Sequence, residues 1–164
     1  NLKTFATLSP IPGFRRWLDA RLAADEPGLL SDPEAASLRS AMPADGGGAA
    51  LAAILAKRGW WQEPNLRKTA EPVLVRLCAR FLLIEANGRR ARDPVAHFHL
   101  SNGARVERLN MAGDTSDKGS QESATMMVNY LYDPAKIEDY HEDYAGEGKR
   151  NASTVVRRLA RGWT

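Results

Sequence analysis

Apolar positions in the first half of the chain recur at the three-to-four-residue spacing of amphipathic helices. One helix is predicted directly after Gly13, because the apolar residues that follow share one face: Phe14, Trp17, Leu18 and Leu22. The same spacing predicts helices over residues 31–41, 49–58 and 70–85. The helix at Ser31 has an early proline and a glutamate three positions on, which is typical of a capped helix start.

The period of the pattern changes in the second half, where apolar and polar residues alternate. This alternation predicts three strands, over residues 95–100, 104–110 and 126–132. The first of these strands would place His97 and His99 on the same face. The polar residues 112–122 predict a loop, and two further helices are predicted over residues 135–144 and 151–161.

Helices followed by a few strands indicate an α/β fold in which several helices pack on a mixed sheet. Three strands are few for an independent sheet beside so much helix. We therefore expect residues 1–164 to be part of a domain, with some strands pairing with upstream residues outside this chain. The chain opens with Asn1 rather than Met, which also indicates a processed chain or a piece of a longer one.

Composition narrows the class of partner. The 164 residues are 43% hydrophobic and 26% charged, as in ordinary globular domains. No apolar run approaches the roughly 20 residues of a membrane-spanning helix, so we expect no membrane partner. The net charge of +3 is modest, and the small arginine clusters suit small anions such as phosphates, or solvated surface, rather than nucleic acid. Cys78 lies in an apolar helical pattern and is interpreted as a buried small hydrophobic residue.

Histidines and a serine are the candidates for chemistry. The spacing of His97 and His99 on a strand suits a metal, but a catalytic zinc site needs a third protein ligand, and the spacing does not nominate His141 or a carboxylate. Either strand histidine can instead be structural or handle protons. Ser9 precedes Pro10, which favours an extended backbone, and a serine so close to a helix start is most often a cap.

Other polar residues of the second half have structural explanations. Tyr130 and Tyr132 are typical of side chains packed on a sheet face, whereas Asn110 and Asp114 are typical of turns. Residue types and spacing alone therefore define only a mixed α and β piece with an acid–base candidate.

Several short segments occur in an order that is specific to one known family. They are Leu8-Ser9-Pro10-Ile11-Pro12-Gly13-Phe14, Trp17-Leu18, Arg76-Leu77-Cys78-Ala79, Asp93-Pro94-Val95-Ala96, Phe98-His99-Leu100, Asn102-Gly103-Ala104, Arg108, Asn110, Asp114 and Met127-Val128-Asn129-Tyr130-Leu131-Tyr132. Together they resemble the malonyl-CoA decarboxylase family. The resemblance covers nearly the whole chain and is weakest over residues 25–70 and after Tyr132.

The resemblance implies a fold and an activity. The chain would be the C-terminal part of an acetyltransferase-like (GNAT) catalytic domain, without the helical N-terminal domain and the start of the catalytic domain. The implied activity is decarboxylation of malonyl-CoA to acetyl-CoA and carbon dioxide, a step of fatty acid metabolism. It would proceed through a thioester enolate, with neither a metal nor an organic cofactor.

The resemblance also implies site residues. Ser9 and His99 would form the catalytic pair, supported by Tyr132, and the enolate left by loss of carbon dioxide would take its proton from that pair. Asn110 and Asp114 would bind the substrate. Which member of the pair donates the proton, and which residues hold the CoA phosphates, stay open.

Partners and location follow from the same resemblance. We expect a homo-oligomer that includes the upstream segment of the same protein. No signal peptide is visible, and residues 161–164 lack the Ser-Lys-Leu signal of some peroxisomal members, so the expected location is cytoplasmic. His97 departs from the family, which usually has Asn at this position, and its role stays open.

Two other functions compete with the decarboxylase. An acyl-CoA-dependent acyltransferase of the same fold would need an acceptor, whereas a decarboxylase releases acetyl-CoA and carbon dioxide without one. A non-catalytic acyl-CoA-binding protein would bind the thioester without turnover. The binding protein predicts no contact between the Ser9 and His99 side chains, whereas the catalytic pair of the decarboxylase requires them to lie within hydrogen-bond reach.

Overall fold

The computed structural model describes residues 3–161. Residues 1–2 and 162–164, and with them the sequence predictions on the first and last positions, lie outside the described part. The helices of the first half are α1 (Phe14–Ala23), α2 (Asp32–Ala41), α3 (Gly47–Ala56), the short 3₁₀ helix η1 (Trp60–Gln62) and α4 (Pro64–Leu83). Those of the second half are α5 (Pro94–Ser101), α6 (Asp117–Ser123), α7 (Ile137–Glu147) and α8 (Thr154–Arg161).

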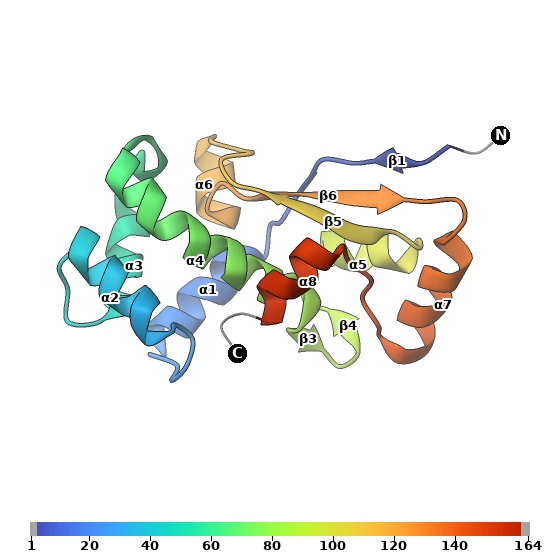
Figure 1. Ribbon diagram of the computed structural model, residues 1–164, viewed down its shortest axis with the longest axis horizontal. Coiled ribbons are helices and arrows are strands. Elements are labelled where there is room, and N and C mark those ends of the chain that lie inside the picture. The colour runs from blue at the N-terminus through green and yellow to red at the C-terminus, as the bar shows by residue number, and fades with distance from the viewer. Residues whose placement is uncertain (1–2, 162–164) are drawn as a thin grey trace.

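The described strands form one sheet and one small hairpin. They are β1 (Phe5–Ala6), β2 (Ser9–Pro10), β3 (Ala86–Asn87), β4 (Arg90–Ala91), β5 (Arg105–Asn110) and β6 (Met127–Tyr132). Helices α1–α4 gather at one end of the molecule, and the sheet lies with α5 and α7 at the other (Figure 1). The predicted helical first half is confirmed apart from its N-terminal segment, where β1 and β2 are strands, and the second half contains strands as predicted.

Strand β6 is the middle of the sheet. It pairs with β5 along one edge and with β1 and β2, two pieces of the N-terminal segment, along the other. All these pairings are antiparallel, so the predicted mixed sheet is wrong for the described strands. The one parallel contact among them is an isolated bridge between Val106 and Ala152. The antiparallel order follows from the connection through α6, which reverses the chain between β5 and β6.

The helix starts follow from local sequence. Ser31 and Glu34 form the predicted capping box, in which the Glu34 N–H donates to Ser31 Oγ and the Ser31 N–H donates to Glu34 Oε1. The predicted helix at 70–85 is also present, but α4 begins earlier, at Pro64, because proline is well suited to the first turn of a helix.

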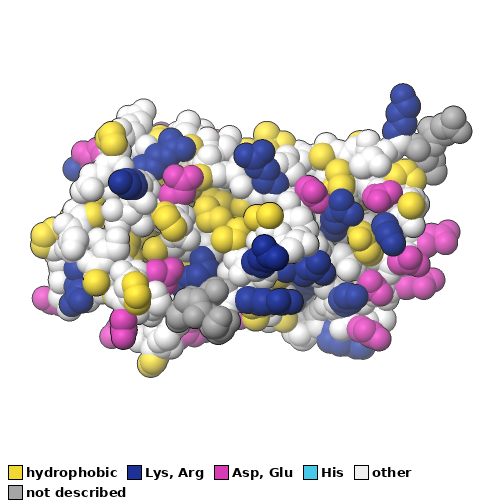
Figure 2. All heavy atoms as spheres, in the orientation of Figure 1, with side chains coloured by type: hydrophobic (Ala, Val, Ile, Leu, Met, Phe, Trp, Pro, Cys, Tyr) yellow, Lys and Arg dark blue, Asp and Glu magenta, His cyan; other side chains and the backbone are white. Residues whose placement is uncertain are grey.

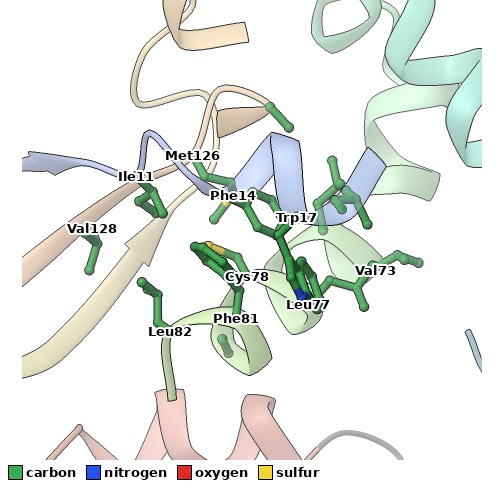
Figure 3. Close-up of a cluster of buried hydrophobic side chains, with 14 of the residues drawn as sticks. Ile11, Phe14, Trp17, Val73, Leu77, Cys78, Phe81, Leu82, Met126 and Val128 are labelled. Carbon is green, nitrogen blue, oxygen red and sulfur yellow. The ribbon is translucent and has the colours of Figure 1, made fainter. Parts of the chain in front are cut away.

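Helix α4 supplies the centre of the apolar core (Figure 3). Its side chains pack against Phe14 and Trp17 of α1 and reach toward Ile11 and β6. Cys78 is fully buried in this cluster, as interpreted from the sequence. Ile11 is also fully buried and lies two residues after Ser9, so the core fixes the path of the segment that carries this serine.

The segment predicted as a strand over residues 95–100 is a helix, α5. Asp93 caps it, since its side chain accepts the Ala96 N–H, and Pro94 occupies the first turn. A six-residue alternation is too short to exclude a helix, and these two start signals outweigh it. Residues two apart in a helix point about 200° apart, so His97 and His99 do not share a face.

The other strands and loops of the second half fit the prediction in part. The strands over residues 104–110 and 126–132 are confirmed as β5 and β6, with an irregularity between Val106 and Arg108. The predicted loop over residues 112–122 contains α6, whose first turn is capped by Ser116. The residues after α4 form the β3–β4 hairpin around Gly88.

The distribution of charged side chains on the surface agrees with the modest net charge of +3. Basic and acidic side chains are interspersed on the face that carries α8, so this face has no broad basic surface (Figure 2). Among residues 3–161, no helix combines the length and the hydrophobicity that a membrane crossing requires.

Gly103 controls the junction between α5 and β5. Its φ is +85°, and a Cβ there would collide with the Ile137 carbonyl group and lie 2.9 Å from Ile137 Cγ2. We expect Gly103→Ala to lower the free energy of unfolding by about 2–4 kcal/mol, since left-handed strain adds to the collision. Gly88→Ala is the control, because Gly88 has φ +64° but open space around it, and should cost only about 1 kcal/mol. Equal losses in denaturant titrations would contradict this explanation.

Candidate active site

The serine predicted from the sequence lies in the short strand β2. Ser9 is opposite Val128 of β6, so its side chain projects from the same face of the sheet as Val128, Tyr130 and Tyr132. Only 6% of Ser9 is exposed. The Ser9 hydroxyl therefore faces the interior, toward α5, rather than capping α1.

His99 meets this serine from α5. Its Nε2 lies 3.2 Å from Ser9 Oγ, although the two residues are 90 positions apart. Its Nδ1 lies 2.6 Å from Tyr132 Oη. The imidazole also stacks on the Tyr130 ring, with centroids 4.3 Å apart and planes 20° apart. The contact between Ser9 and His99 that the sequence analysis requires is thus present, and Tyr132 joins it.

A second hydroxyl extends this chain of polar groups. Thr7 Oγ1 lies 2.9 Å from Ser9 Oγ. The groups Thr7, Ser9, His99 and Tyr132 therefore form one continuous line of hydrogen-bonding atoms, with both ring nitrogens of His99 engaged. Such a line holds and passes protons, because each hydroxyl both donates and accepts.

Burial determines the protonation states of His99 and Tyr132. Burial lowers the pKa of His99 below its usual 6.5, and burial raises the pKa of Tyr132 above 10.0. Both groups are consequently uncharged near neutral pH. One ring nitrogen of His99 then carries a hydrogen and the other accepts one.

Asp93 fixes the distance between the two halves of the site. Its Oδ1 accepts the Gly13 N–H at 3.1 Å, and its Oδ2 accepts the Ala96 N–H at 3.0 Å. One fully buried carboxylate thereby ties the segment that follows Ser9 to the helix that carries His99. Burial raises the pKa of Asp93, although its backbone hydrogen bonds pull in the opposite direction.

The two predicted substrate-binding residues lie elsewhere. Asn110 Nδ2 donates to Asn129 Oδ1 at 2.9 Å, and Asn129 projects from the face of the sheet opposite to Tyr130. Asp114 accepts hydrogen bonds from the backbone N–H and hydroxyl of Ser116. The structure therefore brings neither residue to the Ser9 and His99 side chains.

The other two histidines have separate partners. His97 Nδ1 lies 2.7 Å from Tyr144 Oη, which also accepts the Ala91 N–H. His141 Nδ1 contacts the Ser101 carbonyl oxygen at 2.6 Å. The H-x-H pair thus faces two different environments, and residues 3–161 contain no cluster of three or more His, Cys, Asp or Glu placed to hold a metal ion.

Exposed apolar side chains contact residues of the polar line or adjoin them in the sequence. Phe5 stacks on Tyr132 with centroids 4.8 Å apart, and Phe98 packs edge-on to His99. These two residues and Leu8 are each more than half exposed, at 55%, 60% and 59%. Exposed large apolar side chains at a polar site suit contact with a further part of the protein or with a substrate.

Sequence reasoning did not single out Thr7, Tyr130 or Asp93 as parts of the site. Thr7 had a usable signal, because residues two apart in an extended segment share a face, and Ser9 was already assigned an extended backbone. The roles of Asp93 and Tyr130 had no such signal, since Asp93 links the starts of α1 and α5 and Tyr130 stacks on His99, and both contacts depend on tertiary packing.

The fold and the site together define an α/β domain with a hydroxyl–imidazole centre suited to proton transfer. A family model described as the malonyl-CoA decarboxylase C-terminal domain matches residues 1–163. The chain belongs to the malonyl-CoA decarboxylase family.

Individual relatives agree with this assignment. The chain is 38% identical over 163 residues to "Malonyl-CoA decarboxylase, mitochondrial" of Mus musculus, covering 96% of this chain and 33% of that protein. It is 39% identical over 136 residues to the protein of the same name from Anser anser anser, covering 80% of this chain and 27% of the relative. The chain thus spans about a third of the length of these relatives.

Solved structures give the same result. The crystal structure of malonyl-CoA decarboxylase from Rhodopseudomonas palustris superimposes with a TM-score of 0.82 at 34% identity, over 98% of this chain and 34% of that one. That from Cupriavidus metallidurans gives a TM-score of 0.76 at 38% identity, over 96% of this chain and 38% of the other.

The link made by Asp93 can be tested by substitution. Asp93→Ala leaves the buried Ala96 N–H and the part-buried Gly13 N–H unpaired and should lower the free energy of unfolding by about 2–4 kcal/mol, whereas Asp93→Asn retains one acceptor and should lose less. Ser31→Ala, at a helix cap remote from the site, should cost only about 1 kcal/mol. Denaturant titration provides the comparison, and an Asp93→Ala loss no larger than that of Ser31→Ala would contradict the link.

The lowered pKa of His99 predicts a pH dependence of stability. The unfolded chain takes up a proton at His99 near pH 6.5, whereas the folded protein does so only at lower pH. Stability should therefore fall as pH drops below 6.5 and level off below the folded-state pKa. His99→Gln should show less of this decrease in unfolding measured at a series of pH values. An NMR titration that places the His99 pKa above 6.5 would contradict the prediction.

Proposed function

We propose that the chain is the C-terminal part of the catalytic domain of an enzyme that converts malonyl-CoA to acetyl-CoA and carbon dioxide. Family membership supports the reaction. The observation that carries the proposal is the 3.2 Å contact between Ser9 Oγ and His99 Nε2, because it joins two groups able to move a proton. The proposal includes an acetyltransferase-like (GNAT) domain completed by upstream residues, since the relatives are about three times as long.

The chemistry needs these residue types. Decarboxylation breaks the bond between the carboxylate carbon and the α carbon, and the electron pair moves onto the α carbon and the thioester oxygen. Carbon dioxide leaves and an enolate remains, so the site must stabilise negative charge on oxygen and then protonate carbon. Overall, malonyl-CoA and one proton give acetyl-CoA and carbon dioxide.

Each member of the polar line has a role in this proposal. The Tyr132 hydroxyl donates to Nδ1 of His99, which leaves the ring hydrogen on Nε2. Nε2–H donates to Ser9 Oγ, and the Ser9 hydroxyl is directed toward the substrate. Ser9 and His99 together then stabilise the enolate and deliver its proton, and no step needs a metal or an organic cofactor.

The remaining assignments are proposals of the same kind. Substrate binding by Asn110 and Asp114 stays a prediction; the bond from Asn110 to Asn129 favours a supporting role for Asn110. A homo-oligomer and a cytoplasmic location also stay predictions, and the curated relatives from Mus musculus and Anser anser anser are named as mitochondrial.

Substitutions at the polar line test the activity. In the complete polypeptide, His99→Ala and Ser9→Ala should each lower kcat for malonyl-CoA by about 10²–10⁴-fold while the fold is retained, because each removes a proton-handling group. Tyr132→Phe should lower kcat less, since it removes only the group that orients the imidazole. Release of acetyl-CoA and carbon dioxide, followed without any amine acceptor, is the measurement.

His97→Ala is the matched control, because His97 lies on the same helix but contacts Tyr144 instead. It should retain nearly the full rate. An unchanged rate in His99→Ala would refute the assignment of the pair. A requirement for an acceptor would favour the acyltransferase, and thioester binding without turnover would favour a binding protein.

A further inference from the structure

Thr7 is held in place by its backbone from both sides. Its N–H donates to the Tyr130 carbonyl oxygen at 2.9 Å, and its own carbonyl oxygen accepts from Asn129 Nδ2 at 2.8 Å. The residue lies between β1 and β2, where the regular ladder is interrupted. Strand β6 therefore fixes the Thr7 hydroxyl at its 2.9 Å distance from Ser9 Oγ.

Two members of the polar line, Ser9 and Tyr132, are buried, whereas Thr7 and His99 are half-buried. Tyr132 is 9% exposed and its ring is covered by Phe5. Ser9 is 6% exposed, and both nitrogens of His99 already have hydroxyl partners. Thr7 is half-buried, as is His99, but its hydroxyl contacts Ser9 directly. Solvent can thus reach Ser9 through the Thr7 hydroxyl without displacing a hydroxyl partner of His99.

The proton consumed in each turnover has to be replaced. A neutral His99 that gave its only N–H hydrogen to Ser9 would become an imidazolate, and Tyr132 would have to become a phenolate to prevent this. Burial opposes the phenolate, since it raises the pKa of Tyr132, and an imidazolate is a still less stable anion. A proton that arrives from the other side of Ser9, where Thr7 Oγ1 lies 2.9 Å from Ser9 Oγ, creates neither anion.

We propose that Thr7 relays a proton from solvent to Ser9, and that Ser9 is the immediate donor to the enolate carbon. This inference rests on the proposed decarboxylation. Ser9 Oγ accepts one hydrogen bond from His99 Nε2–H and one from the Thr7 hydroxyl, and donates its own hydrogen to the α carbon. As that bond forms, the Thr7 hydrogen passes to Ser9 Oγ and a water molecule gives a proton to Thr7 Oγ1. The enolate electron pair forms the carbon–hydrogen bond, the thioester carbonyl is restored, and the negative charge leaves the site as hydroxide in solvent, so the step balances.

Thr7→Val and Thr7→Ser separate the relay from simple packing. Valine keeps the branched shape and both backbone bonds but lacks the hydroxyl, whereas serine keeps the hydroxyl. In the complete polypeptide we expect Thr7→Val to lower kcat for malonyl-CoA about 10-fold or more with KM little changed, and Thr7→Ser to restore most of the rate. Thermal unfolding of both variants checks that the fold is intact.

A proton inventory on the wild-type enzyme is independent of any variant. The experiment measures kcat in mixtures of light and heavy water and fits its dependence on the fraction of heavy water. The fit should require at least two transferred protons in the wild type and one in Thr7→Val. A one-proton inventory in the wild type, or equal kcat in wild type and Thr7→Val, would overturn the relay and leave the proposed function standing. A wild-type enzyme without decarboxylase activity would instead overturn both. Failure of Thr7→Ser to recover the rate would also refute the relay.

Discussion

The candidate site depends on one buried carboxylate. Asp93 accepts N–H groups from Gly13 and Ala96, which begin two different helices, and so it makes the start of α1 and the start of α5 parts of one unit. Burying a carboxylate is unfavourable unless hydrogen bonds compensate it. The raised pKa of Asp93 indicates that desolvation outweighs its backbone hydrogen bonds. The protein therefore keeps a carboxylate whose desolvation is unfavourable at the position that sets the distance between Ser9 and His99.

Strand β6 is the second element that fixes the positions of the site residues. On one face it presents Tyr130 and Tyr132 to His99, and along its edge its Tyr130 carbonyl holds the Thr7 backbone. The Asn129 side chain, which leaves the opposite face, also bonds to Thr7. Because side chains alternate along a strand, a one-residue shift of register would exchange the two faces and remove every one of these contacts. The register of a single strand thus positions the hydroxyls and the imidazole together.

Local sequence predicts much of this fold but only part of the site. The capping box at Ser31, the long helix α4 and the strands β5 and β6 all have strong local signals, and each is confirmed. The strand predicted over residues 95–100 is helix α5, because the cap by Asp93 and the proline in the first turn favour a helix more strongly than a six-residue alternation favours a strand. The pairing of Ser9 with His99 came from family resemblance, not from spacing. The link from Asp93 to Gly13 and the stacking of Tyr130 on His99 lay beyond local patterns, since each joins residues that are distant in the sequence.

The misassigned helix changes how the histidines are understood. On a strand, His97 and His99 would share a face and suggest a metal, whereas on α5 they turn to Tyr144 and Tyr132 respectively. The helix thereby gives His99 a site of its own, in which hydroxyls occupy both ring nitrogens and burial keeps the ring uncharged. In the proposed reaction, an uncharged line of donors suits the enolate intermediate. It stabilises a transient negative charge by hydrogen bonds already in place, and it adds no permanent charge that the buried site would have to solvate.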